Sequence, residues 1–307
     1  QLIGQFGVGF YSSFMVADKV EVLSKSAVDS SSATLWKSDG GESYTLEKSD
    51  HSEHGTSIVI KLNKDNEEFI DESRIRFLIN KYSEYINFPI NVQIGDKDEE
   101  RVNNNEAIWL KSKRSVKKDE YDEFYKYISH DFNEPLLTIH NKVEGKQEYS
   151  NLLYIPKKSP FDIWNRDTPK GLKLYIQRVF IMDDASHFLP LYLRFVKGVV
   201  DSNDLPLNVS REILQDHPLV HSIKTALTKR VIDSLRKLKK DDPSQYSEFW
   251  NEFGLVLKEG PAEEPSSKDD IAELFIFSST VNENNQINRS FDAVSYTHLT
   301  LPTNDRV

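Results

Sequence analysis

The sequence predicts a two-domain protein of the mixed α/β (α+β) class, and three observations support this. Its 307 residues correspond to about two domains of ordinary size. Segments with strand-like and helix-like apolar patterns alternate along the chain, as in layered α/β structures. Residues 95–106, GDKDEERVNNNE, hold too few apolar side chains to form a core. We therefore predict a first domain over 1–94, a polar linker over 95–106 and a second domain over 107–291.

The first domain begins with a predicted short helix over 10–20. Short segments that are β-branched or alternate in polarity then predict four strands, over 20–23, 33–36, 44–46 and 56–62. Turn-forming stretches such as SDGG separate them, so we expect an antiparallel meander. Apolar residues spaced by three and four predict a helix over 68–86, and a closing strand follows over 89–94.

The second domain shows the same alternation. The predicted elements are a helix over 119–128, strands over 149–155 and 172–181, a short element over 186–195, and a helix or strand over 271–277. From Ser222 onward, Ile223, Leu227, Val231 and Leu235 form one helical stripe, and basic residues occupy much of the other face. Such a helix could face a membrane or nucleic acid, but a solvated face opposite an apolar core is favoured.

The amino-acid composition narrows the classes of function that the protein can have. The 39 basic and 49 acidic residues leave a net charge of −10, which argues against nucleic acid as the main partner. Without cysteine the chain can form neither disulfides nor thiolate metal sites, and a cytoplasmic protein is expected. The charge-free run at 1–17 is rich in glycine and serine, so no membrane span is predicted. We expect a fragment, because the chain starts with Gln1, and a non-native tail over 292–307.

The glycine-rich run from Gly4 to Phe10 is the first candidate site. It precedes the predicted helix over 10–20, where a flexible backbone and free N–H groups suit a phosphate. Its spacing, G-x-x-G-x-G, is neither the dinucleotide fingerprint nor the P-loop. A tight structural turn remains the alternative and is the more common reading of such a pattern.

The segment from Asp201 to Gln215, DSNDLPLNVSREILQ, is the second candidate site. Ser210 suits a helix N-cap, and Arg211 and Gln215 are four residues apart, so they would share one helical face. A guanidinium beside an amide suits a phosphate oxygen. By pattern alone, an exposed arginine paired with a carboxylate is the simpler interpretation.

A histidine pair and a group of aromatic residues carry weaker signals. His217 and His221 have the spacing of two metal ligands on one helix, but no third ligand accompanies them, so no metal site is predicted. Trp109, Trp164 and Phe161 form aromatic spots near predicted loops and would suit a protein-binding surface if exposed. Burial in the core is the more common fate of tryptophan.

Six separated blocks resemble the bacterial branch of the heat-shock protein 90 family. They are IGQFGVGFYSSFMVADKV, HGTSIVIKL, EGKQEYSNLLYIP, GLKLYIQRVFIMDDA, VDSNDLPLNVSREILQ and FWNEFGLVLKEG. The resemblance runs in register from Gln1 to about Phe291, which makes it far more specific than a glycine motif. It implies the C-terminal part of a GHKL-type ATP-binding α/β sandwich over 1–94. An α/β middle domain of layered sheet and helices would follow over 107–291.

The resemblance also assigns candidate residues. ATP would be bound by the backbone of Gly4, Gln5, Phe6, Gly7, Val8, Gly9 and Phe10 at the phosphates and by Thr56 near the adenine. Arg211 would reach the γ-phosphate as a catalytic residue, with Asn208 and Gln215 close by. Trp109, Phe161 and Trp164 match positions associated with client contact.

The resemblance implies an ATP-driven chaperone that binds unfolded or partly folded client proteins, with ATP and Mg²⁺ as cofactors, cochaperones as partners and a homodimer in the full-length protein. The family's general-base Glu, magnesium-binding Asn and adenine-binding Asp would lie upstream of Gln1, and its dimerisation domain would also lie outside the chain. We therefore expect the chain alone to lack turnover. Two alternatives stay open: an ATP-independent client-binding module, and a DNA-linked GHKL ATPase relative, which the acidic charge disfavours.

Overall fold

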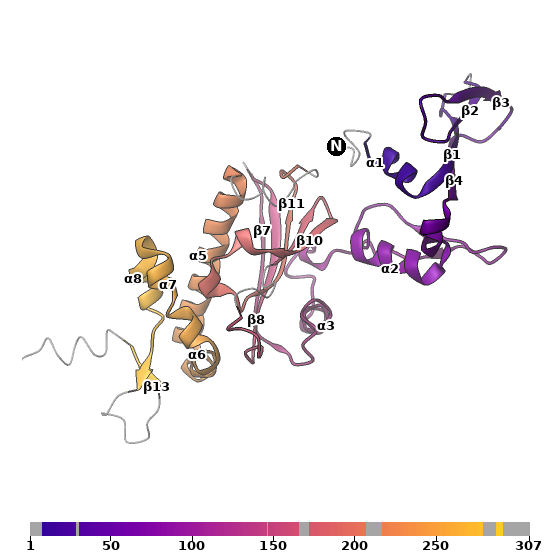
Figure 1. The fold of residues 1–307 in the computed structure, drawn as a ribbon. Coiled ribbons are helices and arrows are strands. Elements are labelled where there is room, and N and C mark those ends of the chain that lie inside the picture. The colour runs from indigo at the N-terminus through magenta and orange to yellow at the C-terminus, as the bar shows by residue number, and fades with distance from the viewer. Residues whose placement is uncertain are drawn as a thin grey trace, which may run out of the picture. The chain divides into compact units, whose positions relative to one another are not determined.

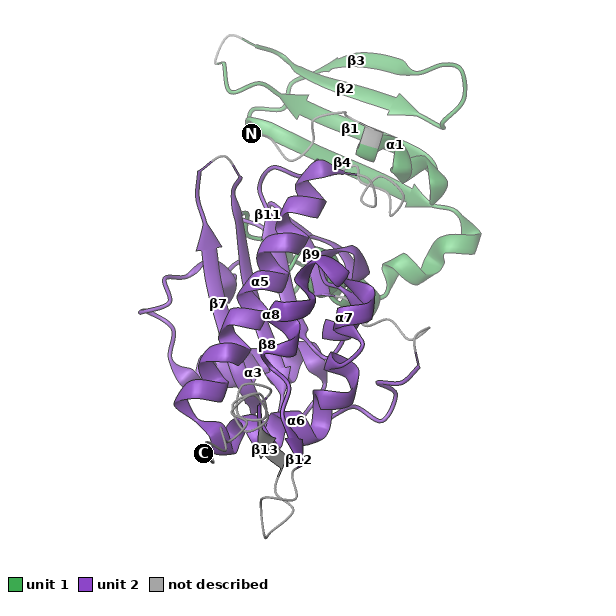
Figure 2. Cartoon of the chain, turned by 90° about the vertical axis from the view of Figure 1, so that its left-hand side faces the viewer, with its two compact units in different colours: residues 1–84, 88–103 green, residues 85–87, 104–307 purple. Residues whose placement is uncertain are grey.

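The computed structural model describes residues 8–28, 31–145, 147–165, 172–206, 217–278 and 287–290. The chain divides into two compact units (Figures 1 and 2). Unit 1 comprises residues 1–84 and 88–103, and unit 2 comprises residues 85–87 and 104–307. Both contain sheets and helices, so the predicted mixed α/β class is confirmed. The expected non-native tail over 292–307 lies outside the described residues.

Unit 1 is built on an antiparallel sheet with the strand order β3-β2-β1-β4. Its strands are β1 (Ala17–Lys25), β2 (Ala33–Ser38), β3 (Thr45–Ser49) and β4 (Gly55–Leu62). The first three strands form the predicted meander, whereas β4 returns to the other side of β1. All four predicted strands are present, with bounds that differ by a few residues.

The helix predicted over 10–20 is wrong in its second half. The chain forms α1 (Val8–Tyr11) and the 3₁₀ turn η1 (Ser12–Met15), and then enters β1 at Ala17. Val20 is fully buried and is paired with both neighbouring strands, opposite Ser38 and Ile60. Pairing on both sides outweighs the local helix preference, because strand formation depends on long-range neighbours.

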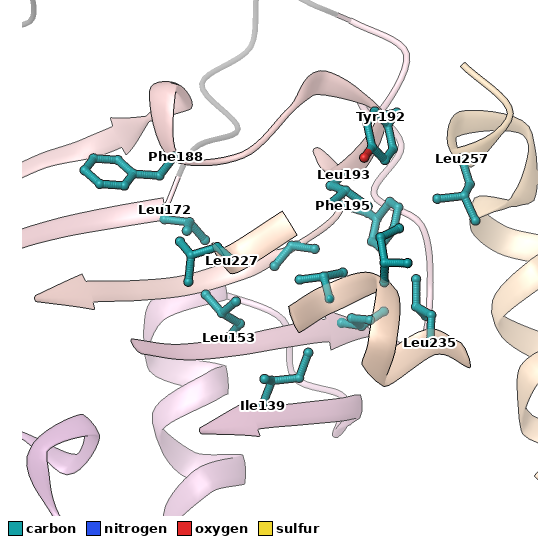
Figure 3. Packing of buried hydrophobic residues seen from close by; sticks show 14 of the residues in the cluster. Ile139, Leu153, Leu172, Phe188, Tyr192, Leu193, Phe195, Leu227, Leu235 and Leu257 are labelled. Carbon is teal, nitrogen blue, oxygen red and sulfur yellow. The ribbon is translucent and has the colours of Figure 1, made fainter. Parts of the chain in front are cut away.

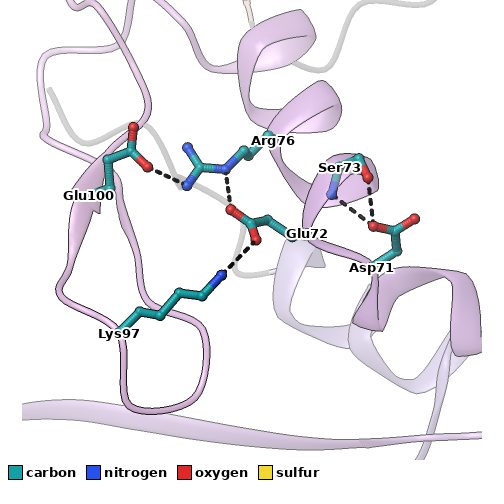
Figure 4. Close-up of polar contacts among 6 residues, drawn as sticks. All are labelled: Asp71, Glu72, Ser73, Arg76, Lys97 and Glu100. Atoms are coloured by element: carbon teal, nitrogen blue, oxygen red, sulfur yellow. Dashed lines mark hydrogen bonds and ion pairs between the residues drawn. The ribbon is translucent and has the colours of Figure 1, made fainter.

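A helix and a small hairpin complete unit 1. The elements are η2 (Lys64–Ile70), α2 (Glu72–Tyr82), β5 (Asn91–Val92) and β6 (Glu100–Arg101). Arg76 on α2 donates to Glu72 at 2.8 Å and to Glu100 on β6 at 2.6 Å, which ties the helix to the hairpin (Figure 4). The helix begins where Asp71 accepts from the Ser73 N–H at 2.9 Å, so it is shorter than the predicted 68–86.

The polar stretch over 95–106 includes ordered structure. It contributes β6, and Asn103 is buried, with its amide bonding the Phe88 carbonyl and the Ile90 N–H at 2.8 Å each. The change from unit 1 to unit 2 falls between Asn103 and Asn104, inside the stretch predicted as a linker. Side-chain bonding to the backbone explains why a segment with few apolar residues still folds.

Unit 2 is built on a five-stranded sheet with the order β10-β9-β11-β8-β7. Its strands are β7 (Pro135–Val143), β8 (Tyr149–Pro156), β9 (Leu172–Ile176), β10 (Val179–Ala185) and β11 (Lys197–Ser202). The single strand predicted over 172–181 is in fact the hairpin β9–β10. Its turn residues, Gln177 and Arg178, have φ of 50° and 67°, and neither residue type signals such a turn.

Helices cover both faces of this sheet. The longer ones are α3 (Lys118–Ser129), α5 (Pro218–Asp241) and α6 (Pro243–Leu257); short ones are η3 (Ile108–Leu110), η4 (Ser186–Phe188), η5 (Leu191–Leu193), α7 (Gly260–Glu263), η6 (Pro265–Ser267) and α8 (Lys268–Ala272). A two-stranded sheet of β12 (Phe277–Ser278) and β13 (Ile287–Arg289) follows. The predicted stripe on α5 is buried, which confirms that helix.

Strand β8 is buried along its whole length and separates two cores. Leu153 faces the larger core with Leu227 and Leu235 of α5 (Figure 3), and Ile155 belongs to the same core. Alternate residues such as Tyr154 face a smaller, aromatic core that α3 covers. Burial on both faces explains why the second half of β8, LLYIP, is a continuous apolar run.

His140 on β7 gives unit 2 a predicted pH dependence. Its Nε2 lies 3.0 Å from the Trp109 carbonyl oxygen and therefore donates, so Nδ1 accepts from the Tyr121 hydroxyl at 2.6 Å. Burial lowers the pKa of His140 below its usual 6.5. Below about pH 6.5 the unfolded chain binds this proton more tightly, so the free energy of unfolding falls as the pH is lowered.

We expect His140→Gln to flatten this fall between about pH 6.5 and pH 5 in urea unfolding. His221→Gln, which changes an exposed histidine on α5, serves as the matched control. Parallel pH profiles for wild type and His140→Gln would show that this histidine does not contribute.

Candidate functional site

Only the end of the expected phosphate loop lies in the described residues. Gly4, Gln5, Phe6 and Gly7 fall outside them, and of Val8 only the backbone is described. Gly9 does not have positive φ, but a side chain there would meet nothing within 4 Å. The Phe10 ring packs edge-on against Trp36 and Phe14, with centroids 5.7 and 6.2 Å away. The accessible group in this part is therefore the backbone at Gly9.

Thr56 lies on β4 of the same unit. Its Oγ1 is 2.8 Å from Ser24 Oγ across the strand pair, and the side chain is exposed. A hydroxyl and an open glycine backbone are groups of the kind that bind nucleotides. They are too few to hold a triphosphate by themselves. The described residues of unit 1 therefore do not make a complete nucleotide site.

The predicted catalytic residues Asn208, Arg211 and Gln215 lie outside the described residues. The structure does describe the strand that leads to them. At its end, Asp201 is buried, and its carboxylate accepts from Trp109 Nε1 at 2.9 Å and from the Arg178 N–H at 3.2 Å. Desolvation raises the pKa of Asp201, and the two donors oppose that rise.

The residues after Asp201 are also held in place. The Ser202 hydroxyl accepts from the N–H groups of Asp204 and Leu205 at 3.3 Å each. The Asp204 carboxylate accepts from the Glu148 N–H at 2.6 Å, and Leu205 is buried. The residues that directly follow β11, as far as Leu205, are therefore held in fixed positions.

We expect Asp201→Asn to destabilise unit 2 by about 1–3 kcal/mol, because an amide would turn its NH₂ toward one of two buried donors. Urea unfolding followed by tryptophan fluorescence measures this. Asp183→Asn is the matched control, since Asp183 is exposed and its pairing with Lys173 contributes little. Equal effects of the two substitutions would show that Asp201 is not the anchor.

Trp109 lies inside unit 2 rather than on its surface. It is fully buried, with ring centroids of Tyr85 and Tyr175 at 4.7 and 4.8 Å. Its indole reaches Asp201 from 92 residues away in sequence. In this structure no partner can touch the Trp109 ring, and the indole instead holds β11 through Asp201.

The loop after β8 does present aromatic side chains outward. Phe161 is 99% exposed and Trp164 is 55% exposed, whereas Ile163 between them is buried in the larger core. The buried guanidinium of Arg194 donates to the Ile163 carbonyl at 2.9 Å and pairs with both oxygens of Glu259 at 2.8 Å. This anchoring holds the loop while Phe161 and Trp164 face solvent.

The described residues show no group of three histidine or carboxylate side chains placed to hold a metal ion. His217 begins α5, where its Nδ1 accepts from the Leu219 N–H at 3.2 Å. No helix in the described ranges is both long and apolar enough to cross a bilayer.

The sheet of unit 2, the anchored end of β11 and the exposed loop lie in a part of the chain that is similar to known proteins. A family model described as Hsp90 protein matches residues 91–293, which is most of the chain. The chain belongs to the Hsp90 family. The match covers nearly all of unit 2, including β11, the segment after it and the exposed loop.

Several curated relatives are similar to this Hsp90 chain over most of its length. Proteins named Chaperone protein HtpG from Salmonella typhi and Cronobacter sakazakii are each 52% identical over 288 residues, covering 91% of this chain and 46% of the relative. The protein of that name from Pasteurella multocida is 51% identical over 296 residues, covering 93% of this chain and 47% of the relative. The chain thus spans about half the length of these relatives.

Two anchors in this Hsp90 chain were not predicted from the sequence. Asp201 joins Trp109 across 92 residues, and Arg194 joins Glu259 across 65 residues. Neither spacing matches a local motif, so only the folded chain brings these groups together. Their common effect is to fix the positions of β11 and the exposed loop, on which the predicted functional residues depend.

Proposed function

We propose that the full-length protein is an ATP-dependent molecular chaperone, with ATP hydrolysis coupled to domain closure. Family membership carries this proposal, because relatives at about half identity are named chaperones. The exposed Phe161 and Trp164 support it, since large exposed apolar side chains mark protein-binding surfaces. Unfolded or partly folded proteins would be the clients. Cochaperones, a homodimer and a cytoplasmic location remain parts of the same proposal.

ATP with Mg²⁺ is the proposed cofactor. Hydrolysis of the terminal phosphoanhydride bond of ATP would supply the chemical energy. In this chain, the backbone from Gly4 to Phe10 would bind phosphate, and Thr56 would lie near the adenine. Arg211 would stabilise negative charge on the phosphoryl group, with Asn208 and Gln215 beside it. The anchored end of β11 supports this role, because the described residues that lead toward Arg211 are held in place.

Client aggregation assays on the full-length protein test the proposal against its alternatives. An ATP-dependent chaperone should protect an unfolding client differently with ATP and with a non-hydrolysable analogue. Equal protection in all nucleotide states would favour the ATP-independent binding module. ATPase activity that rises with duplex DNA would favour the DNA-linked GHKL relative instead.

We expect the 307-residue chain alone to bind ATP weakly and to show no turnover. The glycine loop and Thr56 supply few ligands, and the family's adenine and magnesium ligands would lie upstream of Gln1. Isothermal titration calorimetry with Mg²⁺ and ATP measures the affinity. Low-micromolar binding would contradict this prediction and would show that the chain's own residues suffice.

A further inference from the structure

Unit 2 carries a surface groove of about 400 Å³ beside the exposed loop. Three stretches line it: the end of α3 with the residues that follow, the chain after β8, and the first residue of β11. Phe161 stands at its rim, and Lys197 reaches it from the sheet. The groove thus joins the aromatic loop to a cation on the edge of the smaller core.

Lys197 is the unusual group in this groove. Its side chain is partly buried, and no described residue forms a hydrogen bond or ion pair with its ammonium, although the charges of Asp162 and Asp184 act on it. Burial lowers the pKa of Lys197, while the charges of Asp162 and Asp184 oppose this and that of Lys173 adds to it. A partly desolvated and unpaired ammonium is costly, so an incoming anion would relieve an existing penalty.

The other charged side chains that line the groove, Asp131 and Lys158, already have partners. Asp131 accepts from the Tyr125 hydroxyl at 2.7 Å and from the Asn133 N–H at 3.0 Å. Lys158 pairs with Glu252 at 2.8 Å. Among the charged groups described in the groove, Lys197 is therefore the cation left for a ligand.

The rim of the groove is aromatic. Phe161 lines the groove and is 99% exposed. Leaving this phenyl ring in water has no benefit for folding, because its burial would stabilise the chain. Rings in this position suit contact with an apolar side chain of a partner.

We propose that this groove binds an extended client segment in which an acidic residue stands beside an aromatic one. The carboxylate pairs with Lys197, and the neighbouring ring packs on Phe161. The assignment rests on the proposed chaperone function for the source of the peptide, and it adds the kind of sequence that is preferred. Charge complementarity selects this occupant, because a neutral apolar segment would remove water from the ammonium without offering it an anion.

Two labelled peptides test the proposal with the complete chain in fluorescence polarisation. Both have a Gly-Ser frame with blocked ends, and they differ only in a central Phe-Asp or Phe-Asn. We expect the Asp peptide to bind about tenfold more tightly, and added salt to reduce the difference. Equal affinities for wild type would overturn the proposal, whatever the behaviour of any variant.

Variants then locate the site. Lys197→Met keeps the apolar stem and should remove the preference for Asp, whereas Lys197→Arg should keep it in part. Phe161→Ser should weaken both peptides alike. Lys224→Met is the matched control, since Lys224 is a partly buried lysine on α5 outside the groove and should retain full preference. A Lys197→Met protein that folds and still prefers Asp would place the site elsewhere.

An aggregation assay on a client protein separates this proposal from the chaperone function. Protection without any Asp preference would overturn the groove assignment and leave the proposed function standing. An Asp preference that depends on Lys197, without protection, would support the groove and count against client binding as its role.

Discussion

Arg211→Ala in the full-length protein should lower steady-state ATPase turnover by about tenfold or more and leave the melting temperature nearly unchanged. The reason is the predicted role of its guanidinium, which stabilises charge on the phosphoryl group during transfer. The sequence predicts an exposed arginine at this position, and an exposed arginine contributes little to folding stability, so its loss should affect turnover alone. Arg211→Lys should restore only part of the activity, because an ammonium lacks the planar fork of the guanidinium.

Arg230→Ala provides the matched control for this experiment. Arg230 is an exposed arginine on α5, and its loss should change neither turnover nor melting temperature. Unchanged turnover in Arg211→Ala would reject the catalytic role. A large fall in its melting temperature would favour the alternative that the sequence left open, a structural ion pair with a neighbouring carboxylate.

Gly198→Ala should destabilise unit 2 by about 3 kcal/mol or more, enough to remove much of the stability of an ordinary domain. Gly198 lies on β11 with φ of +143°, a conformation that other residues rarely adopt. A methyl group there would lie 2.2 Å from the Leu152 carbonyl oxygen and 2.8 Å from the Leu153 Cα. Both contacts are with the backbone of β8, so relief requires the central strands to separate.

Gly145→Ala is the control that separates the effect of steric overlap at Gly198 from the effect of the backbone conformation. Gly145 has nearly the same φ, +140°, but a methyl group there would meet nothing within 4 Å. Gly145→Ala should lower the free energy of unfolding only by the cost of the backbone conformation, about 1–3 kcal/mol. The difference between the two variants then measures the cost of the overlap with β8. Urea midpoints followed by fluorescence provide both values. Equal midpoints would show that β8 and β11 can move apart at little cost.

Several elements could be read from the sequence because their signal is local. The stripe of Ile223, Leu227, Val231 and Leu235 predicts α5, and the apolar run in 149–155 predicts β8. Both follow from periodicity, since a helix or strand buries side chains at a fixed spacing. The six blocks of Hsp90-like sequence likewise led to the family before any fold was known, because their order and separation are specific.

Other predictions failed where distant partners decide the outcome. Val20 became part of β1 because strands on both sides pair with it, and the β9–β10 turn at Gln177 and Arg178 has no glycine or asparagine to signal it. The strands β7 and β11 were also missed, since neither bears a clear alternation.

The sequence by itself determined the fold class, the family and the residue types of the candidate sites, because composition, periodicity and ordered motifs are properties of the chain. Only the tertiary structure decided that Trp109 is buried against Asp201, that Phe161 is exposed and that no described residue forms a hydrogen bond or ion pair with the Lys197 ammonium. Burial and pairing depend on residues far apart in the chain, and a side chain's chemistry follows from those neighbours as much as from its own identity.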